Sequence, residues 1–201
     1  MKYIKVITLL LSILLLGCNQ KDKKTKATKE QSTVIAADDK EKLQHLVRQL
    51  YKWHETKSSN HDFDPIADNQ DSIYVGLDLK KHEQRIVELK QTGFFDNQFI
   101  DNYNTIALTI DKGLRNKKLE YLVGELPPYG NDTNPWCNCQ DAPDNYWQKI
   151  KINNITFDNT TATFSWSWGE NFNYKVKAVK LNNNWKISYL QGFDIKEFFP
   201  R

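Results

Sequence analysis

The sequence predicts an α+β domain in which three helices precede a curved, four-stranded antiparallel sheet. Two patterns carry this prediction: apolar residues recur at every second position between residues 146 and 190, and at helical spacing between residues 38 and 116. A sheet with one apolar face must be covered, and the preceding helices are the available cover. We therefore expect the helices to pack on one face of the sheet.

The strand pattern is clearest between residues 161 and 168, where apolar residues alternate with Thr and Ser. Short polar turns at residues 158–159, 169–171 and 182–184 separate the four predicted strands. We expect these side chains on the apolar face: Ile150, Ile152, Ile155 and Phe157; Ala162, Phe164, Trp166 and Trp168; Phe172, Tyr174, Val176 and Ala178; and Trp185, Ile187 and Tyr189.

Three helices are predicted from aspartates that cap them and from apolar stripes with a 3.6-residue period. Asp38 and Asp39 would cap a helix running to about Ser58, Asp78 one over 79–91, and Asp96 one over 97–116. Gly93 would end the second helix. The stripes are Leu43, Leu46, Val47, Leu50 and Tyr51 in the first helix, extended by Trp53 and His54; Leu79, Ile86 and Leu89 in the second; and Phe99, Tyr103, Ile106, Ile110 and Leu114 in the third.

The N-terminus has the build of a bacterial lipoprotein signal. Residues 1–17 combine a basic start with an apolar run from Val6 to Leu16, and Gly17 precedes Cys18. The tetrad from Leu15 to Cys18 resembles a lipobox, which implies cleavage before Cys18 and acylation of this cysteine, with palmitate among the acyl chains. Asn19 replaces the aspartate usual for inner-membrane retention, which favours the outer membrane.

Residues 18–37 are rich in Lys, Thr, Gln and Ser, so we expect a solvated, disordered tether between the anchor and a domain over residues 38–201. From residue 31 on, the chain holds 21 Lys and Arg and 23 Asp and Glu, a net charge of −2. A body so balanced lacks the basic footprint of a nucleic-acid-binding protein.

A family of bacterial lipoproteins of uncharacterised function resembles the chain in the segments LVRQLYKWHE, GELPPYGNDTNPWCNCQDAPDNYW and NNNWKISYLQGFD. The resemblance covers about residues 38–199. It implies a fold similar to nuclear transport factor 2, a cone in which a bent antiparallel sheet wraps around helices. The resemblance brings no catalytic residues, and cones of this kind serve enzymes, binding modules and scaffolds alike.

The least regular segment, residues 124–147, is the candidate ligand site. It interleaves prolines with aromatic residues and carboxylates, and such a loop would lie at the open end of a cone. Aromatic faces beside carboxylates suit a sugar, a peptide or a cell-wall fragment. The candidate ligand-binding residues are Trp53, His54, Tyr129, Trp136, Asp141 and Trp147. The simpler interpretation, which we favour, is that Trp136 and Trp147 plug the mouth of the cone.

Cys137 and Cys139 leave three alternatives open: a labile local disulfide, two buried thiols, or two metal ligands. A metal would need further Cys or His donors, and His82 is the nearest in sequence, so we expect no metal and no cofactor.

The sequence also lacks the residue spacing that zinc-protease and calcium-binding sites require. His54-Glu55 and His82-Glu83 begin like zinc-protease motifs, but position 58 is Ser and position 86 is Ile. The aspartates at 62, 64, 68 and 71 lack the glycine and the terminal glutamate of a calcium loop.

These observations favour a lipid-anchored envelope protein that binds an unidentified protein or small molecule at the open end of the cone and is not an enzyme. The alternatives are a small hydrolase or isomerase using Asp141 or His54 as acid or base, and an immunity-type inhibitor that docks a basic target through the acidic loop at 62–71. A filled interior would favour binding, and a wet pocket with a polar-held carboxylate or imidazole would favour catalysis.

Overall fold

The computed structural model describes residues 21–58, 61–70, 72–169 and 172–199, with side chains from residue 37 on. By its internal contacts the chain divides into two units, residues 1–36 and residues 37–201. In the first unit the structure describes helical backbone from Lys21 on, and the second unit contains all the described strands. In the part of the chain that the structure describes, no helix combines the length and the apolar character needed to cross a bilayer.

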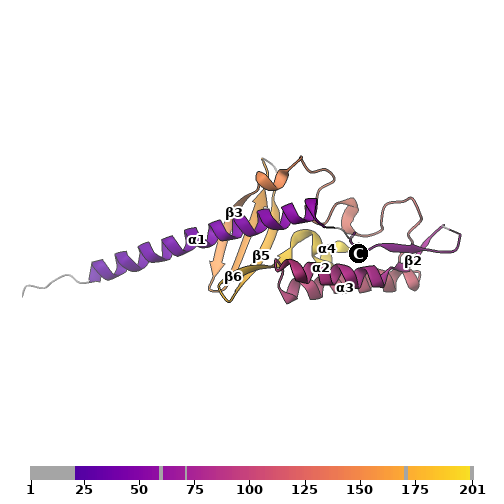
Figure 1. Ribbon diagram of the computed structural model, residues 1–201, viewed down its shortest axis with the longest axis horizontal. Coiled ribbons are helices and arrows are strands. Elements are labelled where there is room, and N and C mark those ends of the chain that lie inside the picture. Colours follow the sequence, from indigo (N-terminus) through magenta and orange to yellow (C-terminus); the bar gives the residue numbers. More distant parts are fainter. Residues whose placement is uncertain (1–20, 59–60, 71, 170–171, 200–201) are drawn as a thin grey trace, which may run out of the picture. The chain divides into compact units, whose positions relative to one another are not determined.

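The second unit is an α+β domain with an open, four-stranded antiparallel sheet (Figure 1). Its strands are β3 (Lys151–Asp158), β4 (Thr161–Ser167), β5 (Tyr174–Leu181) and β6 (Asn184–Leu190), paired in that order. The helices are α1 (Lys21–Thr56), α2 (Leu79–Thr92), α3 (Asn97–Arg115) and the short α4 (Ile195–Phe198). The sequence did not indicate α4 or the small hairpin of β1 (Pro65–Ala67) and β2 (Tyr74–Leu77).

The predicted caps of α2 and α3 are confirmed. The Asp78 carboxylate accepts a hydrogen bond from the Lys81 amide, and that of Asp96 accepts one from the Phe99 amide. Gly93 ends α2 in the left-handed conformation, with a φ of 70°. The apolar stripe of α3 is buried along its whole length, so α3 packs between β2 and β6.

The predicted start of the first helix is wrong. α1 begins at Lys21, well before Asp38, because the sequence from 21 to 37 contains neither proline nor glycine to stop a helix. Asp39 therefore lies inside the helix and binds across to the sheet. Its carboxylate accepts hydrogen bonds from Lys180 Nζ at 2.8 Å and from Trp185 Nε1 at 2.9 Å.

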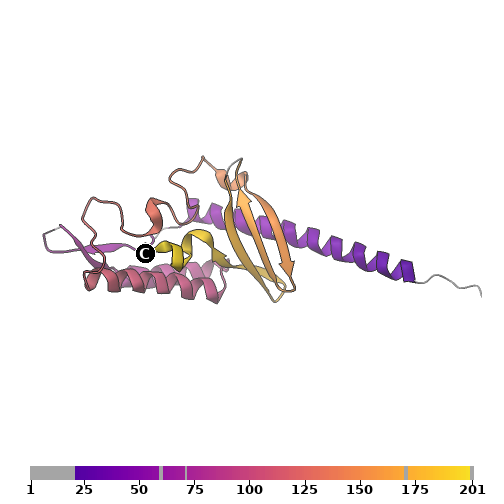
Figure 2. The same ribbon diagram turned by 180° about the vertical axis from the view of Figure 1, so that it is seen from behind.

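Further contacts hold α1 on the inner face of the sheet. Arg48 Nε donates to the carbonyl of Ile150, and the Trp166 indole donates to the Tyr51 hydroxyl. Leu43, Val47, Leu50 and Tyr51 are completely buried there. In Figure 2, which shows the molecule from the side opposite to that of Figure 1, the strands of the sheet lie in front of α1.

The sheet alternation is confirmed except at one residue. Tyr189 was expected on the apolar face, but it pairs with Lys177 and points outward with it. The cause is a shift of register between Lys177 and Ala178, which makes Ser188 an extra residue in β6 and gives the inner position to Leu190. The turn residues 170–171 lie outside the described residues.

Segments before α3 and after β6 complete the packing. The chain at Phe94 and Asp96 hydrogen-bonds to Ile187, so the outer edge of β6 is covered. After β6 comes a 3₁₀ turn over Gln191–Phe193, and its Gly192 lies directly against the loop residue Pro135. A β-carbon on Gly192 would come within 1.9 Å of the Pro135 carbonyl oxygen.

We predict that Gly192→Ala lowers the free energy of unfolding by about 2–3 kcal/mol, because backbone rather than a flexible side chain blocks the added methyl group. Urea unfolding of the purified chain checks this. Gly169→Ala is the matched control, since no atom lies within 4 Å of the position of its added carbon. Equal stability of the two variants would contradict the packing of Gly192 on Pro135.

Candidate functional site

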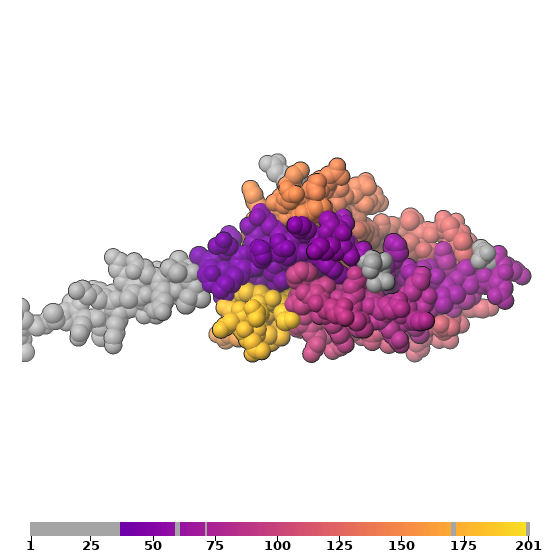
Figure 3. Space-filling model, viewed as in Figure 1, coloured from indigo at the N-terminus to yellow at the C-terminus, as the bar shows by residue number. Residues whose placement is uncertain are grey.

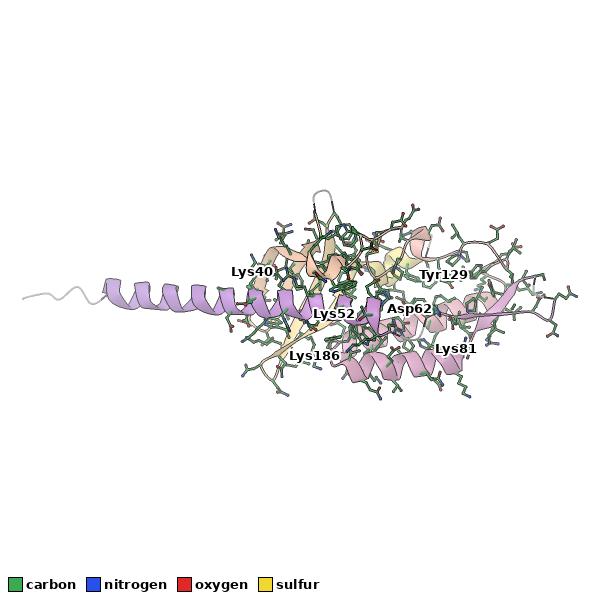
Figure 4. All side chains as sticks on the ribbon, turned by 45° about the horizontal axis from the view of Figure 1, so that its top comes forward. Lys40, Lys52, Asp62, Lys81, Tyr129 and Lys186 are labelled. Atoms are coloured by element: carbon green, nitrogen blue, oxygen red, sulfur yellow. A yellow bond between two sulfur atoms is a disulfide. The ribbon has the colours of Figure 1, made fainter. Side chains whose placement is uncertain are left out.

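The interior at the end of α1 is organised around the Asp62 carboxylate, which lies between α1 and α2 (Figure 4). One of its oxygens accepts hydrogen bonds from Arg85 Nε at 3.0 Å and from the Tyr103 hydroxyl at 2.6 Å. The other accepts one from the Trp136 indole at 2.5 Å. These four side chains, which we call the Asp62 cluster, join a loop, α2, α3 and the proline-rich segment 124–147.

Arg85 is the cation of the cluster, and only 1% of its side chain is exposed. A second guanidinium nitrogen donates to the Ser58 hydroxyl and to the Glu88 carboxylate, and the guanidinium lies over the rings of Trp53 and Trp136. Burial is the largest single effect on the pKa of Arg85 and acts to lower it, but Asp62, Tyr103 and Glu88 together outweigh burial and raise that pKa. The cluster is therefore a charged, hydrogen-bonded pair buried among aromatic rings.

Trp136 fills the centre of the interior and is 1% exposed. The Tyr51 hydroxyl donates to its carbonyl, and the Tyr174 hydroxyl donates to the carbonyl of Pro135, both at 2.6 Å. Its indole also packs edge-on against Phe193. Contacts on both the backbone and the ring fix Trp136 as a structural plug.

His54 stacks on the Trp136 ring with 4.3 Å between the ring centroids. Its Nε2 lies 3.8 Å from a carboxylate oxygen of Glu55, beyond hydrogen-bond distance, and its Nδ1 has no partner among the described residues. Burial lowers the pKa of His54 and outweighs the charges of Asp62 and Glu55, which act to raise it. His54 is thus a neutral imidazole that packs on Trp136.

The remaining predicted site residues do not converge. Tyr129 is buried and stacks on Phe198, far along the loop from the plug. Asp141 is exposed and makes no ion pair or hydrogen bond within the part of the chain that the structure describes. Trp53 is partly buried, edge-on to Trp136. Trp147 is partly buried against Tyr146 and borders a shallow, open hollow of about 230 Å³ with Glu55 and Asp144.

Cys137 and Cys139 form a disulfide, with 5.1 Å between their Cα atoms. Of the alternatives that the sequence left open, this is the local disulfide. It closes the tight turn that directly follows Trp136, where Asn138 takes a left-handed backbone conformation. No group of His, Cys, Asp and Glu that could hold a metal ion occurs among the described residues.

The carboxylates of the 62–71 loop are engaged rather than presented to a partner. Asp62 belongs to the interior cluster, Asp64 forms an ion pair with Lys81, and Asp68 accepts hydrogen bonds from Ser72. Asp71 lies outside the described residues.

An open groove runs along α1 on the side of the molecule shown in Figure 3, where the purple α1 meets the yellow β5–β6 turn. Two adjoining hollows of about 610 and 220 Å³ share Gln49 and Phe94. We call them together the α1 groove. The polar and charged residues along it are Asp38, Glu41, Lys42, His45, Gln49, Lys52, Lys57, Thr92, Asn183 and Asn184, and the apolar ones are Leu46, Trp53, Phe94 and Trp185.

The sequence analysis missed both Arg85 and the groove. Arg85 was detectable, because it stands with His82, Ile86 and Leu89 on the buried stripe of α2, where a charged residue implies a buried partner. The groove had no local signal, because its walls come from α1, the α2–α3 connection and the β5–β6 turn.

The comparisons with known proteins identify no relative: no protein-family model, no curated protein and no solved structure matches the chain.

We predict that Arg85→Met lowers the free energy of unfolding by about 3–5 kcal/mol, because it leaves the Asp62 carboxylate buried without its cation. Asp62→Asn added to Arg85→Met should cost much less than the sum of the two single substitutions. Urea unfolding of the four proteins of this double-mutant cycle measures the coupling. Lys81→Met is the surface control, because that cation is 58% exposed and should cost less than about 1 kcal/mol. Additive single effects would contradict a buried pair.

We predict that acidification below about pH 6.5 destabilises the chain through His54. The pKa of this residue is lower in the folded than in the unfolded state, so the unfolded chain binds the proton first and stability falls as pH drops through that interval. His54→Gln should remove this part of the pH dependence. Unfolding free energies measured from pH 8 to pH 5 test it, and identical pH slopes for both proteins would rule it out.

Proposed function

We propose that the chain is a lipid-anchored protein of the bacterial cell envelope whose folded domain binds a partner or a small ligand and does not catalyse a reaction. The observation that carries the proposal is the filled interior. Trp136 fills the interior at the end of α1, where its indole donates to Asp62 and its carbonyl accepts a hydrogen bond from Tyr51. Space for a second molecule remains on the outside, in the α1 groove.

The anchor is inferred from the sequence, since residues 1–17 and Cys18 lie outside the described residues. A basic start, an apolar run and a small residue before a cysteine are the features that lipoprotein signals share. The early asparagine after Cys18 supports the outer membrane as the destination.

We also propose that the fold is a variant of the nuclear transport factor 2-like cone. The packing of α1 and α3 against an antiparallel meander supports this assignment.

The α1 groove is the proposed binding site in place of the loop at 124–147. It offers apolar surface at Leu46 and Phe94 between lysines and amides, a mixture that suits a peptide or a polar small molecule. The described residues of the loop instead either plug the interior, as Trp136 does, or stand exposed, as Asp141 does.

The catalytic and inhibitor alternatives gain less support. Among the described residues no polar group holds the exposed Asp141, and His54 is stacked and neutral, so neither has there the second polar partner that an acid or base requires. The acidic loop has Asp62 and Asp68 bound internally, which removes charges that an inhibitor would present to a basic target.

A photo-crosslinking amino acid placed at Gln49 in the full chain, in cells of its native host, tests the site. We expect a light-dependent adduct from Gln49 and none from the same group at Glu83, which is exposed on α2. His54→Ala and Asp141→Ala should leave the adduct unchanged. Equal adducts from both positions, or none from Gln49, would contradict binding in the groove.

The same cells test the anchor. Cys18→Ser should move the chain out of the membrane fraction and abolish incorporation of a labelled palmitate analogue. A labelled Cys18→Ser chain that stays with the membrane would contradict acylation at Cys18.

A further inference from the structure

The outer face of the sheet, opposite α1, is uncovered and carries mainly lysines and small polar side chains. The buried residues Ala162, Phe164 and Trp166 of β4 point toward α1, so the residues between them point outward. Residues paired directly across antiparallel strands share a face. Pairing from β4 outward therefore gives the members of this face: Lys151, Asn153, Thr156, Asp158, Thr161, Thr163, Ser165, Ser167, Lys175, Lys177, Val179, Leu181, Asn184, Lys186 and Tyr189.

The lysines form a connected group on this face. Ser167 stands opposite Lys151, Ser165 opposite Lys175, and Thr163 opposite Lys177. Lys175 and Lys177 are two residues apart on β5, about 7 Å along the strand. Lys177 Nζ lies 5.4 Å from the centre of the Tyr189 ring, which confirms that β5 and β6 present these side chains on the same side.

This face has an excess of positive charge in a domain that is acidic as a whole. Within the described residues of the four strands it holds four lysines and one carboxylate, Asp158, at the far end of β3. Some cations elsewhere in the domain are matched: Lys81 with Asp64, Arg115 with Asp111, and Lys180 with Asp39. Lys151, Lys175 and Lys177 form no ion pair with any described residue, and all three are exposed.

The side chains between the lysines indicate which kind of anionic partner this face can bind. A face that rests on a membrane adds exposed Trp, Phe or Leu to its cations, because these side chains enter the lipid boundary. Here Ser165, Ser167 and Thr163 stand between Lys151, Lys175 and Lys177, and their hydroxyl groups exchange hydrogen bonds with other hydroxyl groups. The one strongly exposed apolar side chain of the face in the described residues of the four strands, Leu181, lies at the far end of β5 from Lys175. Tyr189 adds one aromatic ring on which a sugar ring can lie.

We propose that the outer face of the sheet binds an acidic polysaccharide, a sugar polymer bearing carboxylate or phosphate groups. In this complex the lysines form ion pairs with the carboxylate or phosphate groups, and the Ser and Thr side chains form hydrogen bonds with the sugar hydroxyls. An extended polymer can engage Lys175, Lys177 and Lys151 at once. Single exposed contacts of this kind are weak, so binding depends on several sites acting together on one polymer. This surface is separate from the α1 groove, and the inference requires neither the groove nor acylation of Cys18.

Binding of the full chain to immobilised polygalacturonate tests the proposal, with neutral dextran as the reference surface. The chain is used in neutral phosphatidylcholine nanodiscs where its N-terminus requires them. We expect binding to polygalacturonate, none to dextran, and a loss of affinity of at least tenfold when NaCl rises from 50 to 300 mM.

Lys175→Gln with Lys177→Gln should weaken the binding to polygalacturonate by about tenfold or more. Lys80→Gln with Lys90→Gln is the matched control, because it removes the same charge from exposed positions on α2 and should change affinity less than twofold. The midpoint of urea unfolding should stay the same in both variants, which separates lost contacts from a damaged fold.

Three results would overturn the proposal. They are equal weakening by the two pairs of substitutions, equal retention by dextran, and binding to a bilayer of phosphatidylglycerol in the absence of any binding to polygalacturonate. The last result would assign the face to a membrane surface. None of these results bears on the crosslink at Gln49, so the two proposals fail separately.

Discussion

The buried contact between Arg85 and Asp62 is the constraint on which the rest of the domain depends. Because the Arg85 side chain is only 1% exposed, its charge would be costly to bury without the Asp62 carboxylate beside it. The same carboxylate accepts hydrogen bonds from Tyr103 and from the Trp136 indole. These bonds hold the irregular segment 124–147 onto α2 and α3. Once Trp136 is held there, His54 stacks on it, and these side chains fill the part of the interior at the end of α1 that the structure describes.

The proposed function follows from this use of polar residues. Of the groups that resemble an acid–base site by type, Asp62, Glu88 and Glu55 accept hydrogen bonds from Arg85, Tyr103 and Tyr146, and the His54 imidazole stacks on Trp136. Burial holds the pKa of Tyr103 well above its usual range, so its hydroxyl stays protonated and donates a hydrogen bond to Asp62. Among the described residues, two outer surfaces carry the two proposals made above, the α1 groove and the lysine-bearing face of the sheet. We propose both as surfaces for recognition.

Local patterns predicted the parts of the fold that local physics decides. Asp78, Asp96 and Gly93 mark helix ends because each satisfies backbone groups within a few residues of itself. The β4 alternation predicts the buried face because the pleat alone sets it. Tyr189 was misplaced because one extra residue in β6 reverses every later side chain, and the periodicity of a single strand does not contain that residue. The partners of Asp39 and Asp62 were missed because they lie far along the chain, on β5, β6 and the 124–147 segment.

Hydrogen exchange of the Trp136 indole proton, followed by nuclear magnetic resonance, tests the central claim most directly. If the interior is filled and Trp136 is a plug, this proton exchanges only when the domain unfolds, with an opening free energy close to that of global unfolding, whereas the partly buried Trp147 exchanges far sooner. Exchange of the Trp136 proton as fast as that of Trp147 in the native state would show an interior open to water, and would contradict the account.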